Sequence, residues 1–212
     1  LILVATIQGL TEFLPISSSG HLVLIPIVTD FAYQGRVIDV AAHVGTLIAV
    51  AFYLRTEIIA IAVAMLRFGR NDPEHARLGI TLVLATIPVI IAGYSVNYAN
   101  WHWLDMVYSL AIANLIFAVI LWFADKVPAT RRDLGQIGLP HALIIGIVQI
   151  CALIPGASRS GVTMSAARFL GYDRVTAARF SLLLSLPTIA GAGLLKTLDL
   201  VKSRDATLGA DA

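Results

Sequence analysis

The sequence predicts an all-α, polytopic integral membrane protein, and three observations lead to this fold class. Hydrophobic residues make up 58% of the 212 residues, charged residues make up only 13%, and long apolar runs recur along the chain. Soluble domains carry about 25% charged residues, and one buried core could not hide this much apolar surface. The composition also excludes a disordered chain. The net charge of +2 comes with no basic run suited to nucleic acid.

Four apolar stretches are long enough to form spans, since a membrane helix needs about 20 residues. They cover residues 37–54, 78–98, 104–123 and 181–198. A fifth stretch, 58–66, lies between Glu57 and Arg67 and is too short to cross a bilayer. Pro88 and Pro187 lie inside expected spans, where membrane helices tolerate a kink.

Two further apolar stretches, 1–28 and 137–170, are each interrupted by a short polar segment. The interruptions are Pro15-Ile-Ser-Ser-Ser-Gly20 and Pro155-Gly-Ala-Ser-Arg-Ser-Gly161. Their surroundings are similar, because each has a glutamine upstream and an Arg-Val pair downstream that opens a helix; chance similarity is the alternative. The organisation expected is a single membrane domain, itself a fragment of a longer protein. It covers 1–212, with a first repeat over 1–66, a second repeat over 137–198 and a polar tail or loop over 199–212.

The orientation of the two breaks follows from counting spans. If each broken stretch is re-entrant, three spans separate the breaks and place them in opposite orientations. This is the inverted-repeat plan, in which broken helices meet near the bilayer midplane. Segments 55–77 and 124–136 carry seven Lys and Arg residues, whereas 29–36 and 99–103 carry only Arg36. The positive-inside rule then places the first two segments in the cytoplasm.

Polar residues at membrane depth are costly and mark functional sites, and several gather at the first break. Gln8 and Glu12 are four residues apart, so they share one helix face. Ser17 is a good N-cap for a second half-helix, whose first turn carries Ser18 and His21 on one face. Glu12 can act as a base or a metal ligand, and His21 can carry a proton near neutral pH. Ser18 is a candidate nucleophile with His21 as its partner.

The second break presents a matching set of anion-binding groups. Ser158 can cap the helix that follows, and Arg159 lies in its first turn. Free N–H groups at a helix N-terminus bind anions, and the Arg159 guanidinium adds a rigid fork of donors that suits phosphate. Together these groups suit phosphoryl transfer or hydrolysis. The hydroxyls expected to bind a diphosphate are those of Ser17, Ser19, Ser158, Ser160 and Thr163.

Structural roles compete with these interpretations. Serines also line helix–helix contacts in membranes, Arg159 could anchor the topology, and Glu12 and His21 could simply pair with each other. Asp39 and His43 are four residues apart in the first full span. They are interpreted as residues that hold the site residues in position, or as a polar lining of the site. Plain helix packing is the alternative.

These residues resemble the bacterial undecaprenyl-diphosphate phosphatase family, the bacitracin-resistance type. Its first signature, (E/Q)-x-x-x-E followed by a proline, a serine run and Gly-His, is matched by Gln8-Gly-Leu-Thr-Glu12-Phe-Leu-Pro-Ile-Ser-Ser-Ser-Gly-His21. Its second signature, P-G-x-S-R-S-x-x-T, is matched by Pro155-Gly-Ala-Ser-Arg-Ser-Gly-Val-Thr163. The segment Asp39-Val-Ala-Ala-His43-Val-Gly-Thr46 also looks like the first span of that family.

The resemblance implies a membrane enzyme that hydrolyses undecaprenyl diphosphate to undecaprenyl phosphate and inorganic phosphate, recycling the carrier lipid of cell-wall synthesis. It implies a bacterial cytoplasmic (inner) membrane location, an active site facing the periplasm or exterior, and a divalent cation, Mg²⁺ or Ca²⁺. By position, Glu12 and, with less weight, the neutral Gln8 would lie near the metal or the diphosphate. Ser18 and His21 would take part in the reaction, and Arg159 would bind phosphate. The expected partners are a polyprenyl diphosphate and the bilayer, with a homodimer left open.

A secondary transporter or flippase for a phosphorylated lipid is the competing function. Inverted repeats with broken helices are a transporter plan, but a carrier does not need a Ser–His pair beside an arginine. Within the enzyme hypothesis, attack by Ser18 and direct attack by a water that Glu12 or His21 activates both stay open. Type 2 phosphatidic acid phosphatases are set aside, because the position six after Arg159 is Ser165 and not histidine.

Overall fold

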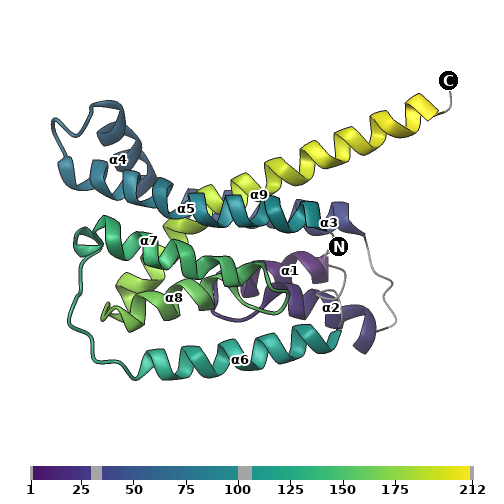
Figure 1. The fold of residues 1–212 in the computed structure, drawn as a ribbon, viewed down its shortest axis with the longest axis horizontal. Helices are drawn as coiled ribbons and strands as arrows, with labels where there is room; N and C mark the ends of the chain where they lie inside the picture. Colours follow the sequence, from purple (N-terminus) through teal and green to yellow (C-terminus); the bar gives the residue numbers. More distant parts are fainter. Residues whose placement is uncertain (1, 30–34, 100–106, 211–212) are drawn as a thin grey trace.

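A computed structural model describes residues 2–29, 35–99 and 107–210, and the regular structure in these ranges is helical, which confirms the predicted fold class (Figure 1). An isolated bridge between Arg131 and Tyr172 is the one β-type pairing in this part of the chain. The elements in order are α1 (Ile2–Thr11), α2 (Ser18–Val28), α3 (Arg36–Tyr53), α4 (Arg55–Leu66), α5 (Pro73–Ala99), α6 (Val107–Asp125), η2 (Leu134–Gln136), α7 (Leu139–Val148), η3 (Gln149–Leu153), α8 (Arg159–Phe169) and α9 (Arg174–Ala210).

Within residues 2–29, 35–99 and 107–210, three helices are long and apolar enough to cross a membrane. The segments concerned are Pro73–Val96 in α5, Tyr108–Asp125 in α6 and Arg174–Leu194 in α9. The α3–α4 pair adds a further crossing if it is one span, but α4 is bent by 78° from α3. The bend agrees with the prediction that 58–66 is too short to span by itself.

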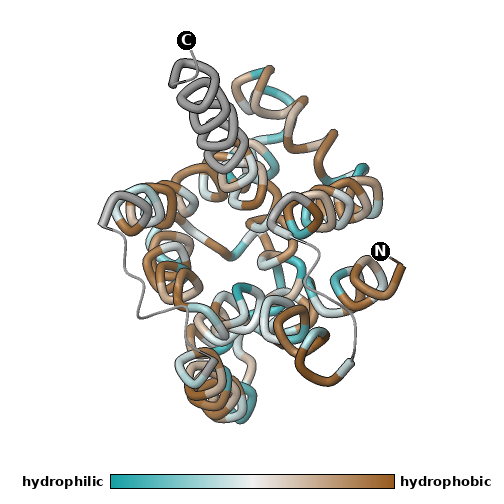
Figure 2. Tube along the Cα trace, turned by 90° about the vertical axis from the view of Figure 1, so that its right-hand side faces the viewer, coloured by the Kyte–Doolittle hydropathy of each residue, from teal (hydrophilic) through white to brown (hydrophobic). Residues whose placement is uncertain are grey.

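The distribution of polar residues is the reverse of that in a soluble protein. Large apolar side chains such as Ile48 (65% exposed) and Leu115 (68% exposed) lie on the outside, whereas Gln8, Gln149 and Ser185 are fully buried. Viewed along the long axis of Figure 1, hydrophilic segments lie toward the middle of the bundle and hydrophobic faces surround them (Figure 2). This arrangement suits a chain whose surroundings are hydrocarbon and whose polar groups must find partners inside.

The two sequence breaks form hairpins with the same local structure. Ser17 and Ser158 both adopt extended conformations, with φ −72° and ψ 109° or 121°, and each accepts a hydrogen bond of 3.2 Å from the backbone N–H three residues on. In Figure 1 the α1–α2 hairpin opens toward the right and the α7–α8 hairpin toward the left. Opposite openings are what an inverted repeat requires, and the repeat relationship itself stays a prediction.

The structure differs from the expected elements in two places. The second hairpin tightens into the 3₁₀ segment η3 before its break, so the regular helix ends at Val148. At the other end of the chain, α9 continues to Ala210 through the residues expected to form a polar tail or loop, and it projects from the bundle (Figure 1). A helix with few apolar residues can persist there because nothing in its sequence breaks the backbone hydrogen bonding.

The segments predicted to share one side of the membrane meet at one end of the bundle. Arg77 donates a hydrogen bond to the carbonyl of Gly135, which joins segment 55–77 to segment 124–136. Arg174 donates two hydrogen bonds of 2.6 Å to the carboxylate of Asp125. Nearby, the hydroxyl and the backbone N–H of Thr176 donate to Asp173 and lower the pKa of that carboxyl. These contacts agree with the grouping that the loop charges predicted.

The main core packs α5 against α7 and α9, and one glycine allows a close approach between α5 and α7. The Gly146 backbone lies so near α5 that a Cβ at this position would overlap the carbonyl oxygen of Ala85. At Gly93 on α5, by contrast, an added Cβ would meet only Leu153 Cδ2 at 3.7 Å, an ordinary contact.

Gly146→Ala is therefore expected to destabilise the fold by about 1–3 kcal/mol, the usual cost of overpacking a core. Gly93→Ala, the matched control, adds the same methyl group where there is room and should stabilise its helix by up to about 1 kcal/mol. Thermal unfolding of both variants in detergent measures the difference. Equal melting temperatures would contradict the close α5–α7 packing.

Candidate active site

A pocket with a volume of about 260 Å³ lies where the two breaks meet α3 and α9. Its lining combines residues from segments far apart in the sequence. The polar residues that line it are Glu12, Ser17, Ser18, Ser19, His43, Ser158, Arg159 and Thr188. All but Thr188 were selected from the sequence, so the fold gathers most of the predicted site into one place.

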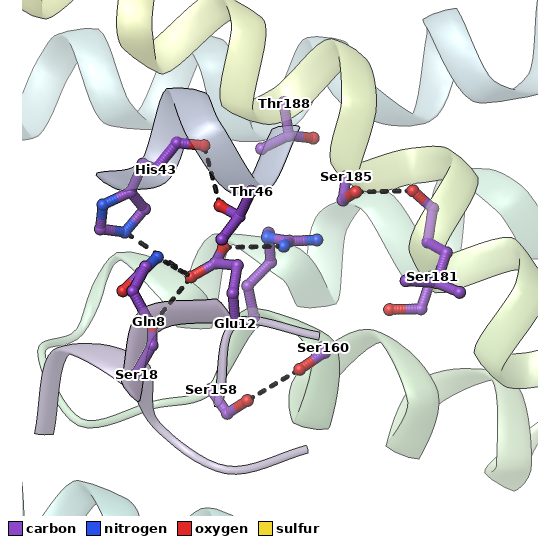
Figure 3. Close-up of polar contacts among 12 residues, drawn as sticks. Gln8, Glu12, Ser18, His43, Thr46, Ser158, Ser160, Ser181, Ser185 and Thr188 are labelled. Atoms are coloured by element: carbon purple, nitrogen blue, oxygen red, sulfur yellow. Dashed lines mark hydrogen bonds and ion pairs between the residues drawn. The ribbon is translucent and has the colours of Figure 1, made fainter. Parts of the chain in front are cut away.

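The carboxylate of Glu12 is the centre of this pocket (Figure 3). Its Oε2 accepts hydrogen bonds of 2.8 Å from Gln8 Nε2 and from Ser18 Oγ, and it lies 3.6 Å from His43 Nε2. Its Oε1 accepts a 3.1 Å bond from Nη2 of Arg159. The two charged side chains are only 7% and 14% exposed. Two neutral donors, Gln8 and Ser18, and one cation, Arg159, therefore surround this buried carboxylate.

Local sequence explains how Glu12 reaches this position. Its N–H donates to the Gln8 carbonyl at 2.9 Å, so helical geometry persists to the break and places both side chains on one face. Ser17 then caps α2, whose first residue is Ser18. The chain reverses between Glu12 and Ser17, and the Ser18 hydroxyl is thereby brought back onto the carboxylate.

The second break is fixed against the first and against α6. Ser160 Oγ donates a 2.6 Å hydrogen bond to the carbonyl of Leu14. Gly156 has a φ of +95°, and a Cβ at this position would overlap the carbonyl oxygen of Leu110 in α6. A glycine is therefore required here both by conformation and by space. These contacts hold the N-terminus of α8, which carries Arg159, beside the first break.

Two hydroxyls predicted to bind the diphosphate lie outside the pocket. Ser160 donates to the first break, as described, and accepts or donates a 3.0 Å bond with Ser158. Thr163 Oγ1 lies 2.9 Å from the carbonyl of Arg159 and 2.7 Å from Ser181 Oγ on α9. Both side chains therefore join elements together. Ser17, Ser19 and Ser158 do line the pocket.

The structure corrects the predicted partner of Ser18. His21 is exposed, does not line the pocket, and has its Nδ1 2.7 Å from the carbonyl of Ser17. The histidine that faces Glu12 is His43, which the sequence placed only in a supporting layer. Its Nδ1 lies 2.7 Å from the backbone carbonyl of Asp39, one turn earlier in α3. Because a carbonyl can only accept, Nδ1 carries a proton and Nε2 of the neutral ring is left as an acceptor.

Sequence reasoning did not identify the wall that α9 contributes. Thr188 lines the pocket, donates to the Leu184 carbonyl at 2.8 Å and accepts a 3.1 Å bond from Gln149 Nε2. Gln149 was recognised only as the counterpart of Gln8 in the other repeat. The signal available was a threonine directly after Pro187 in an otherwise apolar span, followed by small residues.

The donor set allows a divalent cation only together with a substrate. No group of three His, Cys, Asp or Glu side chains is placed to hold a metal in the described ranges. Glu12 is one carboxylate, and the neighbouring Gln8 has a buried Oε1 without a hydrogen-bond partner. Mg²⁺ is commonly held by one or two carboxylates plus substrate phosphates, and Glu12 fits that mode of binding, whereas Gln8 does not line the pocket and turns its Nε2 toward Glu12.

Comparison with known proteins identifies a consistent set of relatives. The family model described as "Bacitracin resistance protein BacA" matches residues 1–211. A protein of Dinoroseobacter shibae named undecaprenyl-diphosphatase is 47% identical over 218 aligned residues, covering 100% of this chain and 80% of that protein. One from Teredinibacter turnerae with the same name is 48% identical, covering 95% of this chain and 77% of its own length. A third, from Ruegeria pomeroyi, is 44% identical, covering 100% of this chain and 80% of that protein.

The buried Glu12–Arg159 pair predicts non-additive effects on stability. Glu12→Gln or Arg159→Met alone should cost about 3–5 kcal/mol, because each leaves an uncompensated buried charge. The double variant should be more stable than either single variant. The control is the partly exposed Arg179–Glu57 pair, whose double-mutant cycle should give a coupling within about 1 kcal/mol. Melting temperatures in detergent measure both cycles, and additive losses at Glu12 and Arg159 would refute a direct pairing.

Proposed function

This chain belongs to the bacitracin resistance protein BacA family, and on that premise we propose that the Glu12 pocket is the site at which undecaprenyl diphosphate is hydrolysed. The chain is a phosphatase that converts undecaprenyl diphosphate to undecaprenyl phosphate and inorganic phosphate. The observation that carries the assignment of the site is the buried contact between Glu12 and Arg159. It joins, in one pocket, the two motifs that otherwise lie 147 residues apart.

The diphosphate would be held by the second break. The bond to Glu12 uses one of the five N–H donors of the Arg159 guanidinium, and the others suit phosphate oxygens. The N-termini of α2 and α8 both lie at the pocket, through Ser18 and Arg159, and their dipoles favour an anion there. The hydroxyls of Ser19 and Ser158 add neutral donors at the same surface.

Ser18 is the nucleophile that the geometry supports best. Its Oγ already donates to Glu12 Oε2, so Glu12 can take the proton as Oγ attacks the terminal phosphorus. An Oγ–P bond forms, the bridging P–O bond breaks, and undecaprenyl phosphate leaves with the bond electrons. A water then attacks the phosphoserine, with His43 Nε2 as the acceptor of its proton. The Oγ–P bond breaks, inorganic phosphate leaves, and Glu12 returns its proton to Ser18 Oγ. In the alternative without a phosphoserine, Glu12 activates the water directly.

A divalent cation, Mg²⁺ or Ca²⁺, is part of the proposal. Glu12 would hold it together with oxygens of the substrate, and the Gln8 amide would orient the Glu12 carboxylate through its Nε2. When bound, the cation neutralises charge on the diphosphate. Binding of the diphosphate falls to Arg159 and the pocket hydroxyls, and proton transfer falls to Glu12 and His43.

We also propose that the protein lies in the bacterial cytoplasmic membrane with its pocket reached from the periplasm or exterior. The support is the basic end of the bundle, at Arg77, Arg131 and Arg174, which the positive-inside rule assigns to the cytoplasm. All the groups of the proposed mechanism come from one chain, so the chemistry needs no second copy. A homodimer is therefore neither required nor opposed by the site.

The direct test is phosphate release from undecaprenyl diphosphate by purified protein in detergent, with and without Mg²⁺ or Ca²⁺. Wild type should release phosphate in a cation-dependent way. Ser18→Ala should lower kcat about a thousandfold or more if serine attacks, because the nucleophile is lost. Ser19→Ala, a neighbouring pocket serine without the bond to Glu12, serves as the matched control and should stay within about tenfold.

The outcomes separate the remaining alternatives. Substantial turnover by Ser18→Ala would show direct attack by water and remove the phosphoserine. No phosphate release by folded wild type would overturn the enzymatic role of the pocket, and translocation of a phosphorylated lipid would be measured next.

The two histidines give a second, internally controlled test. His43→Gln should lower kcat by about 10²–10⁴-fold, since general acid–base catalysis contributes that much. His21→Gln should keep near-wild-type kcat, because His21 lies outside the pocket. A larger loss of kcat in His21→Gln than in His43→Gln would make His21 the functional histidine.

A further inference from the structure

Undecaprenyl diphosphate is an amphiphile, so its site must join a charged end to an apolar end that reaches the lipid. The pocket has both. Besides Glu12 and Arg159, its lining includes apolar residues: Ile16 from the first break, Val40 and Val44 from α3, and Ile189, Ala192 and Gly193 from α9. The α3 helix carries His43 between its two valines, so polar and apolar linings adjoin within one turn.

The apolar lining reaches the outside of the bundle along α3 and α9, two helices that contact each other. Val44 is 42% exposed and Ala192 is exposed, so both lie at the surface of the part of the chain that the structure describes. A Cβ built at Gly193 would meet nothing within 4 Å, which shows open space beside this backbone. Gly191, two residues earlier, faces Ile90 of α5 instead. The small residues of α9 therefore leave a gap on the pocket side in particular.

A second apolar groove, of about 530 Å³, runs between α1 and the other side of α3, and it is a weaker candidate for the lipid chain. Its lining includes Ala5, Gly9, Ala42 and Gly45. None of its lining residues also lines the Glu12 pocket. A chain covalently attached to a diphosphate in the pocket would leave through the α3–α9 opening without crossing a helix.

We propose that the polyprenyl chain of the substrate leaves the pocket between α3 and α9, and that Ala192 and Gly193 keep this opening wide enough for it. The proposal rests on the proposed function, because it concerns the lipid part of that same substrate. The residues on α9 then determine specificity for a lipid-linked diphosphate, while the breaks recognise its head group. A larger side chain at either position narrows the exit and acts on binding of the chain, not on the chemistry.

The test compares two identical substitutions on one helix. Ala192→Leu fills the opening, whereas Ala190→Leu adds the same atoms to an exposed position that does not line the pocket. Phosphate release is measured with undecaprenyl diphosphate and with five-carbon isopentenyl diphosphate. Ala192→Leu should raise KM for the long substrate about tenfold or more, the effect of a misfitting methylene group in an apolar site. Its kcat/KM for the short substrate should stay within about threefold of wild type, and Ala190→Leu should match wild type on both.

Each result has a distinct meaning. Equal behaviour of Ala192→Leu and Ala190→Leu, with an active wild type, would overturn the proposed exit and leave the phosphatase intact. Equal loss on both substrates in Ala192→Leu would also overturn it, because the substitution would then act on the pocket itself. Phosphate release from neither substrate by wild type would refute the proposed function. Gly193→Leu is the second variant, expected to repeat the chain-length effect.

Discussion

The fold is organised around the need to keep a carboxylate and a guanidinium inside a membrane-embedded bundle. A charge at this depth is costly, and Glu12 and Arg159 are both largely buried. Each charge lowers the free-energy cost of burying the other, and Gln8 and Ser18 donate the remaining hydrogen bonds to the carboxylate. Since the partners come from opposite ends of the chain, the interaction also determines how the two hairpins meet.

That requirement explains the polar interior around the pocket. The breaks expose helix N-termini and carbonyls that hydrocarbon would leave unsatisfied. Ser17 and Ser158 satisfy the N-termini by capping, and Ser160 satisfies the Leu14 carbonyl across the interface. The same groups that stabilise the breaks present donors to an anion. Largely the same residues therefore satisfy the hydrogen-bonding groups of the breaks and recognise phosphate.

The features that the sequence predicted are local ones. Runs of apolar residues, Pro15 and the capping serines determine where helices form and break, and the structure agrees at Ser17 and Ser158. The sequence did not predict that His43, and not His21, faces Glu12, because spacing along α2 cannot show which face of α3 lies across the pocket. It did not predict the contact of Ser160 with Leu14 for a similar reason, since the two residues lie 146 positions apart. The α9 wall was missed because small apolar residues carry no chemical signal of their own.

The separation of 147 residues between Glu12 and Arg159 has a consequence for biogenesis. At synthesis rates of about 5–20 residues per second, roughly 7 to 30 seconds pass between the appearance of the acid and that of its counter-ion. During that interval Gln8, Ser18 and His43 are available to contact the carboxylate, but its counter-ion is not. Because an unpaired charge is costly at membrane depth, we expect the first hairpin to reach its final depth only after the second hairpin is made. The membrane-embedded fold can therefore be completed only after translation has passed Arg159.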